Sequence, residues 1–387
     1  MTARVWLTPA VVSVLLVAGA SGCASRYAHP LPAEAVTHRA KTADGWEIAL
    51  VQYKPEGTPK GRPVLLCHGI SANARHMDLD EAHSLARWLA RNGREAWTMS
   101  LRGTGDSDRA SAREGREPGY SFDTVWQKDH PAAIAYVRAN AVTPSLVEAA
   151  LQRGEGLPEH VAALREPQPL IDYIGHSMGG MLIYAYLSQG GEGLNAVVTL
   201  GSPTRLDWGG PVEPVVAAGS KRFIRSKVML PMEGPALLSM PLQGYVPGTP
   251  LERLLYNPEN SSRDAWRRLI AIGTADMSSG LWLQVVGMVE SGRFESADGK
   301  VDYRRDMSRI RTPVFVVAGK VDRIATPPAV RDGYRALGGH KEWFLAGESS
   351  GLFADYGHMD LLIGREASRE VFPRVLDFLD RHASSAR

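Results

Sequence analysis

The chain has 387 residues, of which 44% are hydrophobic and 22% are charged, and this composition excludes disordered and fibrous proteins. Its 44 basic and 42 acidic residues give a formal net charge of +2 and form no long run of one sign. Neither a nucleic-acid footprint nor a polybasic membrane patch is visible in the sequence, so we expect small partners that are not polyanionic and no nucleic acid.

The first 23 residues are typical of an export signal. Arg4 precedes an apolar stretch over residues 10–20, which is short for a membrane span, and small residues then lead into Cys23. A small residue before a cysteine resembles the lipobox of bacterial lipoproteins, in which Cys23 would be acylated, although Ala20 stands where leucine is commoner. The alternative is a secretory signal cleaved near residues 20–24. We expect an exported protein, held by lipid in the bacterial cell envelope and able to contact the membrane through Cys23, or otherwise periplasmic or secreted.

From residue 46 onward, strand-like apolar runs alternate with helical patterns. The predicted strands are residues 46–53, 63–67, 95–100, 170–174, 196–200, 313–318 and 341–345. The predicted helices, with apolar residues three and four apart, are residues 79–91, 122–139, 178–189, 328–337 and 365–382. This alternation predicts an α/β fold with a mainly parallel, doubly wound sheet covered by helices on both faces.

Two segments interrupt the alternation. Residues 141–169 lead from a helix into a strand, so we expect them at the edge of the sheet away from the strand carboxyl ends, where ligands bind. Residues 204–309 follow a strand and are expected to fold over the ligand-binding edge as an inserted cap or lid. The predicted core then consists of residues 36–203 and 310–387.

The predicted cap contains two apolar runs, residues 228–232 and 236–242, which are broken by proline and glycine. Their methionine and leucine side chains suit an acyl chain or a lipid interface. The alternative is that they form the small core of the cap itself.

Residues 175–179 read Gly-His-Ser-Met-Gly, between the predicted strand 170–174 and the predicted helix 178–189. A serine flanked by glycines at such a turn is typical of a nucleophile elbow, in which only small neighbours fit around a strained backbone. We predict that Ser177 is a nucleophile supported by Gly175 and Gly179. The alternative is an ordinary glycine-rich turn.

A serine nucleophile requires a base that takes its proton and an acid that orients the base. On sheets with such an elbow, the acid and then the histidine follow the serine on loops at the carboxyl ends of later strands. Asp322 follows the predicted strand 313–318, and His358 follows the predicted strand 341–345. We predict that Asp322 is the acid and His358 is the base, the alternative for Asp322 being a carboxylate that only stabilises a turn.

Other candidates are placed less well. His340 precedes the last strand and so lies at the wrong edge of the sheet, while His130 belongs to a helical pattern. His176 is expected to point away from its neighbour Ser177 and to be a packing residue. Asp360 is the rival acid, and we expect it to cap the helix that follows it.

The oxyanion of an acyl-transfer reaction requires two aimed backbone donors. The elbow supplies the N–H of Met178, and the loop after the strand 63–67 supplies the N–H of Ile70. In this loop His68 and Gly69 are supporting residues, because glycine permits a close approach of the backbone.

Several of these motifs resemble those of a known family. These motifs are the pair His68-Gly69, the run Arg-Gly-Thr-Gly-Asp-Ser at 102–107, the elbow at 175–180, Asp322 and His358. With them, the chain resembles the α/β-hydrolase superfamily from about residue 36 onward. Segments 42–45, 120–123, 129–132 and 356–361 resemble acid lipases, whereas the run 102–107 resembles esterases and monoacylglycerol lipases. Met178 stands where acid lipases usually have glutamine. The resemblance implies the α/β-hydrolase fold and a serine hydrolase acting on ester bonds.

We therefore expect a carboxylic ester hydrolase of the lipase or esterase type that reacts through an acyl-enzyme. The expected substrate is a hydrophobic ester, either a small molecule or a lipid. The alternatives are an acyltransferase using the same acyl-enzyme and a non-catalytic lipid-binding envelope lipoprotein. No metal or other cofactor is expected, because the sequence has no His-x-x-x-His pair, no cysteine pair of ligand spacing and no phosphate-loop lysine. The sequence leaves the oligomeric state open.

Overall fold

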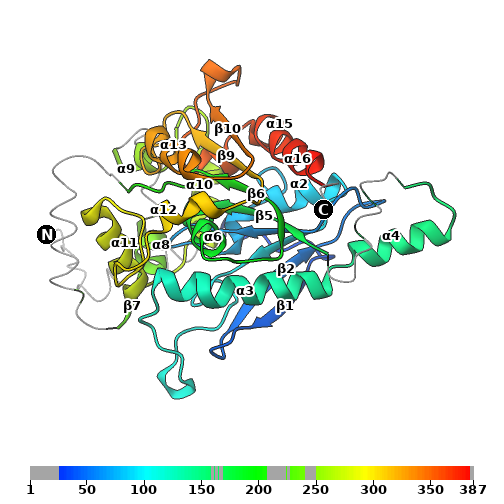
Figure 1. The fold of residues 1–387 in the computed structure, drawn as a ribbon. Helices are drawn as coiled ribbons and strands as arrows, with labels where there is room; N and C mark the ends of the chain where they lie inside the picture. The colour runs from blue at the N-terminus through cyan, green and yellow to red at the C-terminus, as the bar shows by residue number, and fades with distance from the viewer. Residues whose placement is uncertain are drawn as a thin grey trace, which may run out of the picture.

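An eight-stranded sheet runs through the molecule and is covered by helices (Figure 1). The computed structural model describes residues 26–157, 161, 164, 169–206, 224, 227–239 and 250–383. The strands, in their order across the sheet, are β1 (Val36–Lys41), β2 (Glu47–Tyr53), β4 (Ala96–Met99), β3 (Val64–Cys67), β5 (Ile171–His176), β6 (Leu194–Leu200), β9 (Val314–Gly319) and β10 (Lys341–Ala346). The pairs β1–β2 and β2–β4 are antiparallel and the other five are parallel. The predicted α/β fold with a mainly parallel sheet is confirmed.

Strand β3 shows why the central strands have a continuous apolar signal. Leu65 and Cys67 pack into the core on one face of the sheet, and Val64 and Leu66 pack into the core on the other. All four side chains are fully buried, because successive residues of a strand point to opposite faces and both faces are covered.

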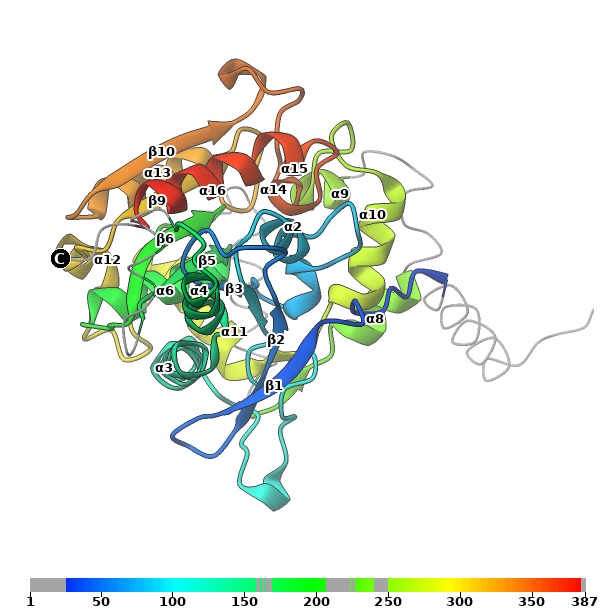
Figure 2. The same cartoon turned by 90° about the vertical axis from the view of Figure 1, so that its right-hand side faces the viewer.

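Helices α3, α6 and α11 lie on one face, and α2 and α14–α16 lie on the other (Figure 2). The helices of the described chain are α2 (Leu85–Arg91), α3 (Phe122–Asn140), α4 (Thr143–Gln152), α6 (Met178–Ser188), α8 (Glu233–Ser239), α9 (Pro250–Leu255), α10 (Arg263–Arg268), α11 (Ser279–Ser291), α12 (Tyr303–Asp306), α13 (Pro327–Ala336), α14 (Asp360–Ile363), α15 (Ala367–Glu370) and α16 (Phe372–Arg381). None of these helices combines the length and the apolar character needed to cross a bilayer.

Two predicted helices differ from the observed ones. The helix expected from residue 79 begins at Leu85, because the Asp80 carboxylate accepts two backbone N–H groups in the preceding loop and Ser84 then caps α2. The helix expected over residues 365–382 is divided into α15 and α16 at Val371. Pro373, which has no N–H to donate, lies in the first turn of α16, where a helix tolerates it.

The described parts of the two interrupting segments lie at different places. The first forms α4, none of whose residues lines the cavity beside Ser177. The second, within residues 204–309, includes α8–α12 and the two-stranded sheet of β7 (Met229–Leu230) and β8 (Met277–Ser278), and it contributes to the wall of that cavity. The predicted export signal and Cys23 lie outside the described residues.

Candidate active site

Ser177 forms the turn between β5 and α6, with φ 55° and ψ −121°. A positive φ is uncommon for serine and marks a strained position that its surroundings must enforce. A Cβ at Gly175 would lie 2.5 Å from Gly180 N, and one at Gly179 would lie 2.5 Å from Cys67 O. Glycine is therefore required on both sides of the serine.

Ser177, His358 and Asp322 form one chain of hydrogen bonds. Ser177 Oγ donates to His358 Nε2 at 2.9 Å, and His358 Nδ1–H donates to Asp322 Oδ2 at 2.7 Å. The other carboxylate oxygen, Oδ1, accepts the backbone N–H groups of Ile324 at 2.9 Å and Ala325 at 2.8 Å. These two amides fix the carboxylate, and the carboxylate fixes the His358 tautomer whose Nε2 is free to accept a proton.

Asp360, the rival acid, is engaged elsewhere. Its Oδ2 accepts the backbone N–H groups of Gly357 at 2.6 Å and Asn257 at 2.7 Å, and its Oδ1 accepts the Ser261 hydroxyl. Burial raises the pKa of Asp360 to about 6. The expected role as a helix cap is corrected: Asp360 ties the loop that carries His358 to the segment 257–261.

The other histidines weighed from the sequence lie away from the serine proton. His340 lies just before β10, at the amino end of the strand, and His130 is buried in α3, where its Nε2 is 3.0 Å from the Tyr173 hydroxyl. His176 Nε2–H donates to the backbone carbonyl of His358 at 3.1 Å. His176 is more than the expected packing residue, because it also lines the cavity beside Ser177.

The loop after β3 passes directly over the elbow. A Cβ on Gly69 would lie 2.9 Å from Ser177 Cβ, so only glycine permits this approach. Ile70 follows at the cavity wall, and Met178 begins α6 on the other side of the serine. Their backbone N–H groups are our predicted oxyanion donors, and this role stays a prediction.

His68 holds the shape of that loop. Its Nδ1–H donates to Gly69 O at 2.8 Å, and its Nε2 accepts the backbone N–H of Leu101 at 3.1 Å. Burial lowers the pKa of His68 to about 4, so the imidazole is neutral and can make both bonds at once.

The inserted segment is joined to the same loop by its backbone. Asn73 N–H donates to Gly273 O at 3.0 Å, Ala275 N–H donates to Ser71 O at 3.0 Å, and Ala72 forms a bridge with Thr274. A π-helical turn, Leu269–Gly273, leads into this contact. The cavity wall and the loop over the serine are thus one continuous structure.

A cavity of about 440 Å³ opens beside Ser177 and His358. This volume is within the range for a small-molecule site. Its wall is mainly apolar, and the inserted segment contributes Pro231, Met232, Pro235, Ala236, Ser239, Leu255, Trp266, Leu269, Ile270 and Thr274.

The cavity also contains His76, which the sequence did not single out. It belongs to a short 3₁₀ turn, Ala74–Met77, after the loop over the serine. Burial lowers its pKa to about 3, and its Nδ1 is buried without a hydrogen-bond partner. No motif marks this position, and its surroundings come from the distant segment around Gly273.

Arg102 joins three of the motifs that carried the family resemblance. Its guanidinium lies 2.7 Å from the buried Asp129 and 2.7 Å from Asp44, and it lies over the ring of Trp46. Because all these contacts are within the protein, the motifs at 42–45, 102–107 and 129–132 support the architecture beneath the site.

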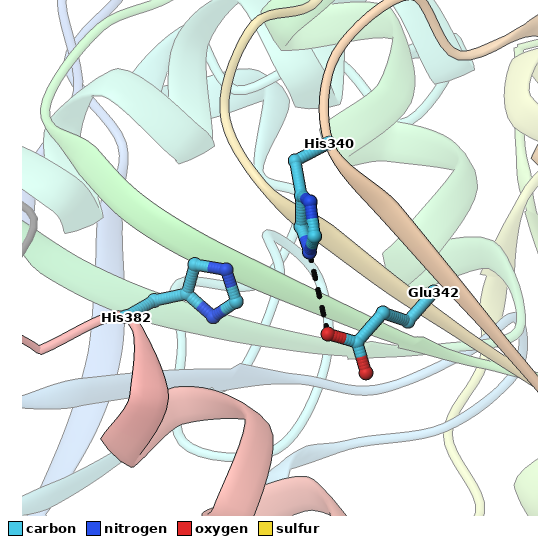
Figure 3. Close-up of side chains that lie close together, drawn as sticks. All are labelled: His340, Glu342 and His382. Carbon is cyan, nitrogen blue, oxygen red and sulfur yellow. Dashed lines mark hydrogen bonds and ion pairs between the residues drawn. The ribbon is translucent and has the colours of Figure 1, made fainter.

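In the described part of the chain, one group of side chains has the composition of a metal site. His340, Glu342 and His382 place ligand atoms within 4.8 Å of one another near the start of β10 and the end of α16 (Figure 3). The Glu342 carboxylate is already paired with both terminal nitrogens of Arg381, at 2.6 and 2.9 Å. This group lies at the opposite edge of the sheet from the strand ends that carry Asp322 and His358, and the expectation of no metal stays a prediction.

Comparison with known proteins relates the chain to α/β-hydrolases. The family model described as the alpha/beta hydrolase fold matches residues 62–218. A soluble variant of monoglyceride lipase from Saccharomyces cerevisiae is 16% identical with a TM-score of 0.57, over 92% of this chain and 99% of that one. An esterase from Exiguobacterium antarcticum is 16% identical with a TM-score of 0.51, over 89% and 99% of the two chains. The monoacylglycerol lipase of Paleococcus ferrophilus is 17% identical with a TM-score of 0.51, over 87% and 99%.

No curated protein matches the sequence significantly. The family model and the structural matches confirm the predicted fold and the predicted resemblance to esterases and monoacylglycerol lipases. At these identities the solved structures establish likeness of fold.

Proposed function

Since the chain has the α/β-hydrolase fold, we propose that it is a carboxylic ester hydrolase of the esterase or lipase type. The observation that carries the proposal is the hydrogen-bonded chain Ser177–His358–Asp322 at the wall of an apolar cavity. Serine at the elbow favours acyl chemistry, because its hydroxyl becomes a nucleophile once His358 takes the proton.

The proposed reaction has two halves. Ser177 Oγ attacks the ester carbonyl while His358 Nε2 takes its proton, and the same nitrogen then donates that proton to the departing alcohol. Water repeats the sequence on the acyl-enzyme and releases the acid. Asp322 stabilises the imidazolium, and the N–H groups of Ile70 and Met178 bind the oxyanion, each donor contributing about 3 kcal/mol to the transition state.

The cavity wall supports a hydrophobic or lipid ester as the substrate. Its side chains from the inserted segment are mostly aliphatic or aromatic, and burial of a hydrocarbon chain against them is favourable by about 25 cal/mol per Å². Of the two predicted apolar runs, Met232, Ala236 and Ser239 line this wall, and residues 240–242 lie outside the described residues.

The test is hydrolysis of p-nitrophenyl esters from acetate to palmitate, with fluorophosphonate labelling of Ser177. We expect turnover and labelling in the wild-type protein and neither in Ser177→Ala. Absence of both in folded wild-type protein contradicts the proposal. Product analysis with added glycerol distinguishes hydrolysis, which releases free acid, from acyl transfer, which forms a new ester.

We further propose that the protein is exported and anchored by lipid at Cys23, on the basis of the N-terminal sequence pattern. Labelled palmitate should enter the wild-type protein and not Cys23→Ala. Export without labelling in the wild type indicates the simple secretory signal instead.

A further inference from the structure

The group His340, Glu342 and His382 lies at the surface, where ions from solvent can reach it. His340 precedes β10, Glu342 lies within β10, and His382 follows α16, so the side chains converge from the edge strand and the last helix (Figure 3). Their ligand atoms lie within 4.8 Å of one another, and His382 is partly exposed. The side chains of His340 and Glu342 are 55% and 29% exposed. A cation therefore has a path to this group in the fold as it stands.

The spacing of the first two ligands is that of a tetrahedral metal site. His340 Nε2 lies 3.3 Å from Glu342 Oε1, which is long for a hydrogen bond. Two ligands bonded tetrahedrally to zinc, each at about 2.0–2.1 Å, are separated by about 3.3 Å. The two residues are two positions apart where β10 begins, so they point to the same face of the strand. Zinc would take the place of the hydrogen between these two atoms.

The third ligand, His382, is held in the tautomer that a metal requires. Its Nδ1–H donates to the backbone carbonyl of Phe378 at 2.8 Å, so Nε2 has the free lone pair. Metal-binding histidines ordinarily make such a bond from the ring nitrogen that is not the ligand, because it fixes the ring and its tautomer. The ring lies 5.0 Å from that of His340, centroid to centroid. A shift of at most about 1.5 Å closes the group to tetrahedral spacing.

The backbone at both histidines is fixed before any metal binds. Val314 N–H donates to His340 O at 3.0 Å, and Asn195 Nδ2–H donates to His382 O at 3.1 Å. Glu342 is held by the pairing of β10 with β9. Binding would therefore order only side chains, which keeps its entropic cost small.

Arg381 is the competitor of a bound cation. Its terminal nitrogens pair with Oε1 and Oε2 of Glu342 at 2.6 and 2.9 Å, and its Nε–H donates to Asp377 at 3.0 Å. The side chains of Arg381 and Asp377 are 48% and 68% exposed, so the guanidinium can leave Oε1 and keep Asp377 as its partner. The hydrogen bond from Arg381 also lowers the pKa of Glu342 to about 2, so the carboxylate is ionised at neutral pH.

The chemistry of the ligands selects the metal. Two imidazoles and one carboxylate suit zinc, and three protein ligands leave the fourth tetrahedral position for water. Calcium and magnesium ions bind through oxygen ligands and are disfavoured by two imidazole nitrogens.

We propose that His340, Glu342 and His382 form a zinc site that joins the edge strand of the sheet to the last helix. The inference is independent of ester hydrolysis, because the site lies at the opposite edge of the sheet from the ends that carry Asp322 and His358. It differs from the expectation of no metal, which considered ligand pairs of short spacing. His382 is far from the other two ligands along the chain, so such spacings do not contain it.

The test is calorimetric titration of zinc chloride into the untagged, metal-free wild-type protein. We expect one equivalent to bind at this site with a Kd in the micromolar range, weaker than four-ligand structural sites, and to raise the unfolding temperature. Magnesium chloride should give no binding. The variants His340→Gln, Glu342→Gln and His382→Gln should each lower the zinc affinity by about 10- to 100-fold. Unfolding curves without zinc verify that these variants are folded.

Matched variants separate a built site from general surface binding. Arg381→Gln should tighten zinc binding by about 2- to 5-fold, since the metal no longer displaces an exposed ion pair. Arg153→Gln removes the same charge from a pair with Glu155 and should leave the affinity unchanged. His83→Gln should also leave it unchanged, because His83 is paired with the single carboxylate of Asp80.

Each outcome decides the inference. Absence of micromolar binding, or binding that any one of the three ligand variants keeps at wild-type strength, overturns it and indicates an adventitious ion only. Unchanged or weaker binding in Arg381→Gln also overturns it, because Glu342 is then not a ligand. Ester hydrolysis stands in all these cases. Zinc binding as expected in a wild-type protein without ester turnover supports the zinc site and overturns the proposed hydrolysis.

Discussion

Replacement of Asp322 by asparagine tests whether this carboxylate sets the tautomer of His358. In the wild type, Oδ1 accepts the N–H groups of Ile324 and Ala325, and Oδ2 accepts His358 Nδ1–H. In Asp322→Asn the single amide oxygen stays with the two backbone donors, because an NH₂ group there would face N–H groups. The NH₂ must then turn toward Nδ1.

An NH₂ group can bond to Nδ1 only when that nitrogen has no hydrogen, so the imidazole proton moves to Nε2. His358 then cannot accept the Ser177 proton. The same error of tautomer in a serine protease lowers kcat about 10⁴-fold, which corresponds to about 5.5 kcal/mol of activation free energy. We expect a loss of this size with little change in the unfolding temperature, since shape and the backbone bonds are kept.

The assay is the steady-state hydrolysis of a p-nitrophenyl ester, with the number of folded molecules taken from the unfolding enthalpy. Asp360→Asn is the matched control, because Asp360 is also a buried carboxylate close to His358 but accepts only the amides of Gly357 and Asn257 and the Ser261 hydroxyl. A loss below 100-fold in Asp322→Asn, or an equal loss in the control, would refute the reasoning.

Three further predictions concern stability. The pKa of Asp360 is raised from 3.8 to about 6 in the folded state, so its contribution to stability is present below about pH 4 and is lost as the pH rises through about 6, by at most about 3 kcal/mol. The free energy of unfolding, measured by denaturation across this pH range, should therefore change less with pH in Asp360→Asn than in the wild type. Equal slopes of the two proteins contradict this. Gly179→Ala should be destabilised and inactive, because its Cβ would lie 2.5 Å from the backbone oxygen of Cys67. In Gly287→Ala, within α11, the new Cβ meets nothing within 4 Å, so the free energy of unfolding in urea should rise by about 1 kcal/mol. Similar effects of the two substitutions refute the steric argument. In Arg102→Leu the free energy of unfolding should fall by about 3–5 kcal/mol, because Asp129 stays buried without its partner. A fall below about 1 kcal/mol in urea unfolding would show that the stability of the fold does not depend on this ion pair.

The sequence predicts those parts of the site that follow from the order of strands. Strand β3 is apolar along its whole length because both its faces are covered, so its position can be found without tertiary information. Loops at the carboxyl ends of parallel strands meet at one edge, and the order Ser177, Asp322, His358 therefore predicts residues that the structure brings within hydrogen-bonding distance. Their catalytic role stays a prediction.

The sequence fails where a role depends on packing between distant segments. Asp360 is two residues from His358, yet its partners Asn257 and Ser261 are about a hundred positions away. His76 has no periodic or motif signal, and its surroundings in the cavity wall come from the Gly273 turn of the inserted segment. Proline and glycine interrupt that segment, so its short helices give no clear pattern.

The hydrogen bonds between Asn73 and Gly273 and between Ala275 and Ser71 tie the wall of the cavity to the loop that carries Ile70. Any movement that lifts this part of the inserted segment must either break these bonds or displace the loop that carries Ile70. A substitution in the inserted segment around Gly273 is therefore expected to alter the placement of the predicted oxyanion donor Ile70, although Gly273 lies outside the Ser177–His358–Asp322 chain.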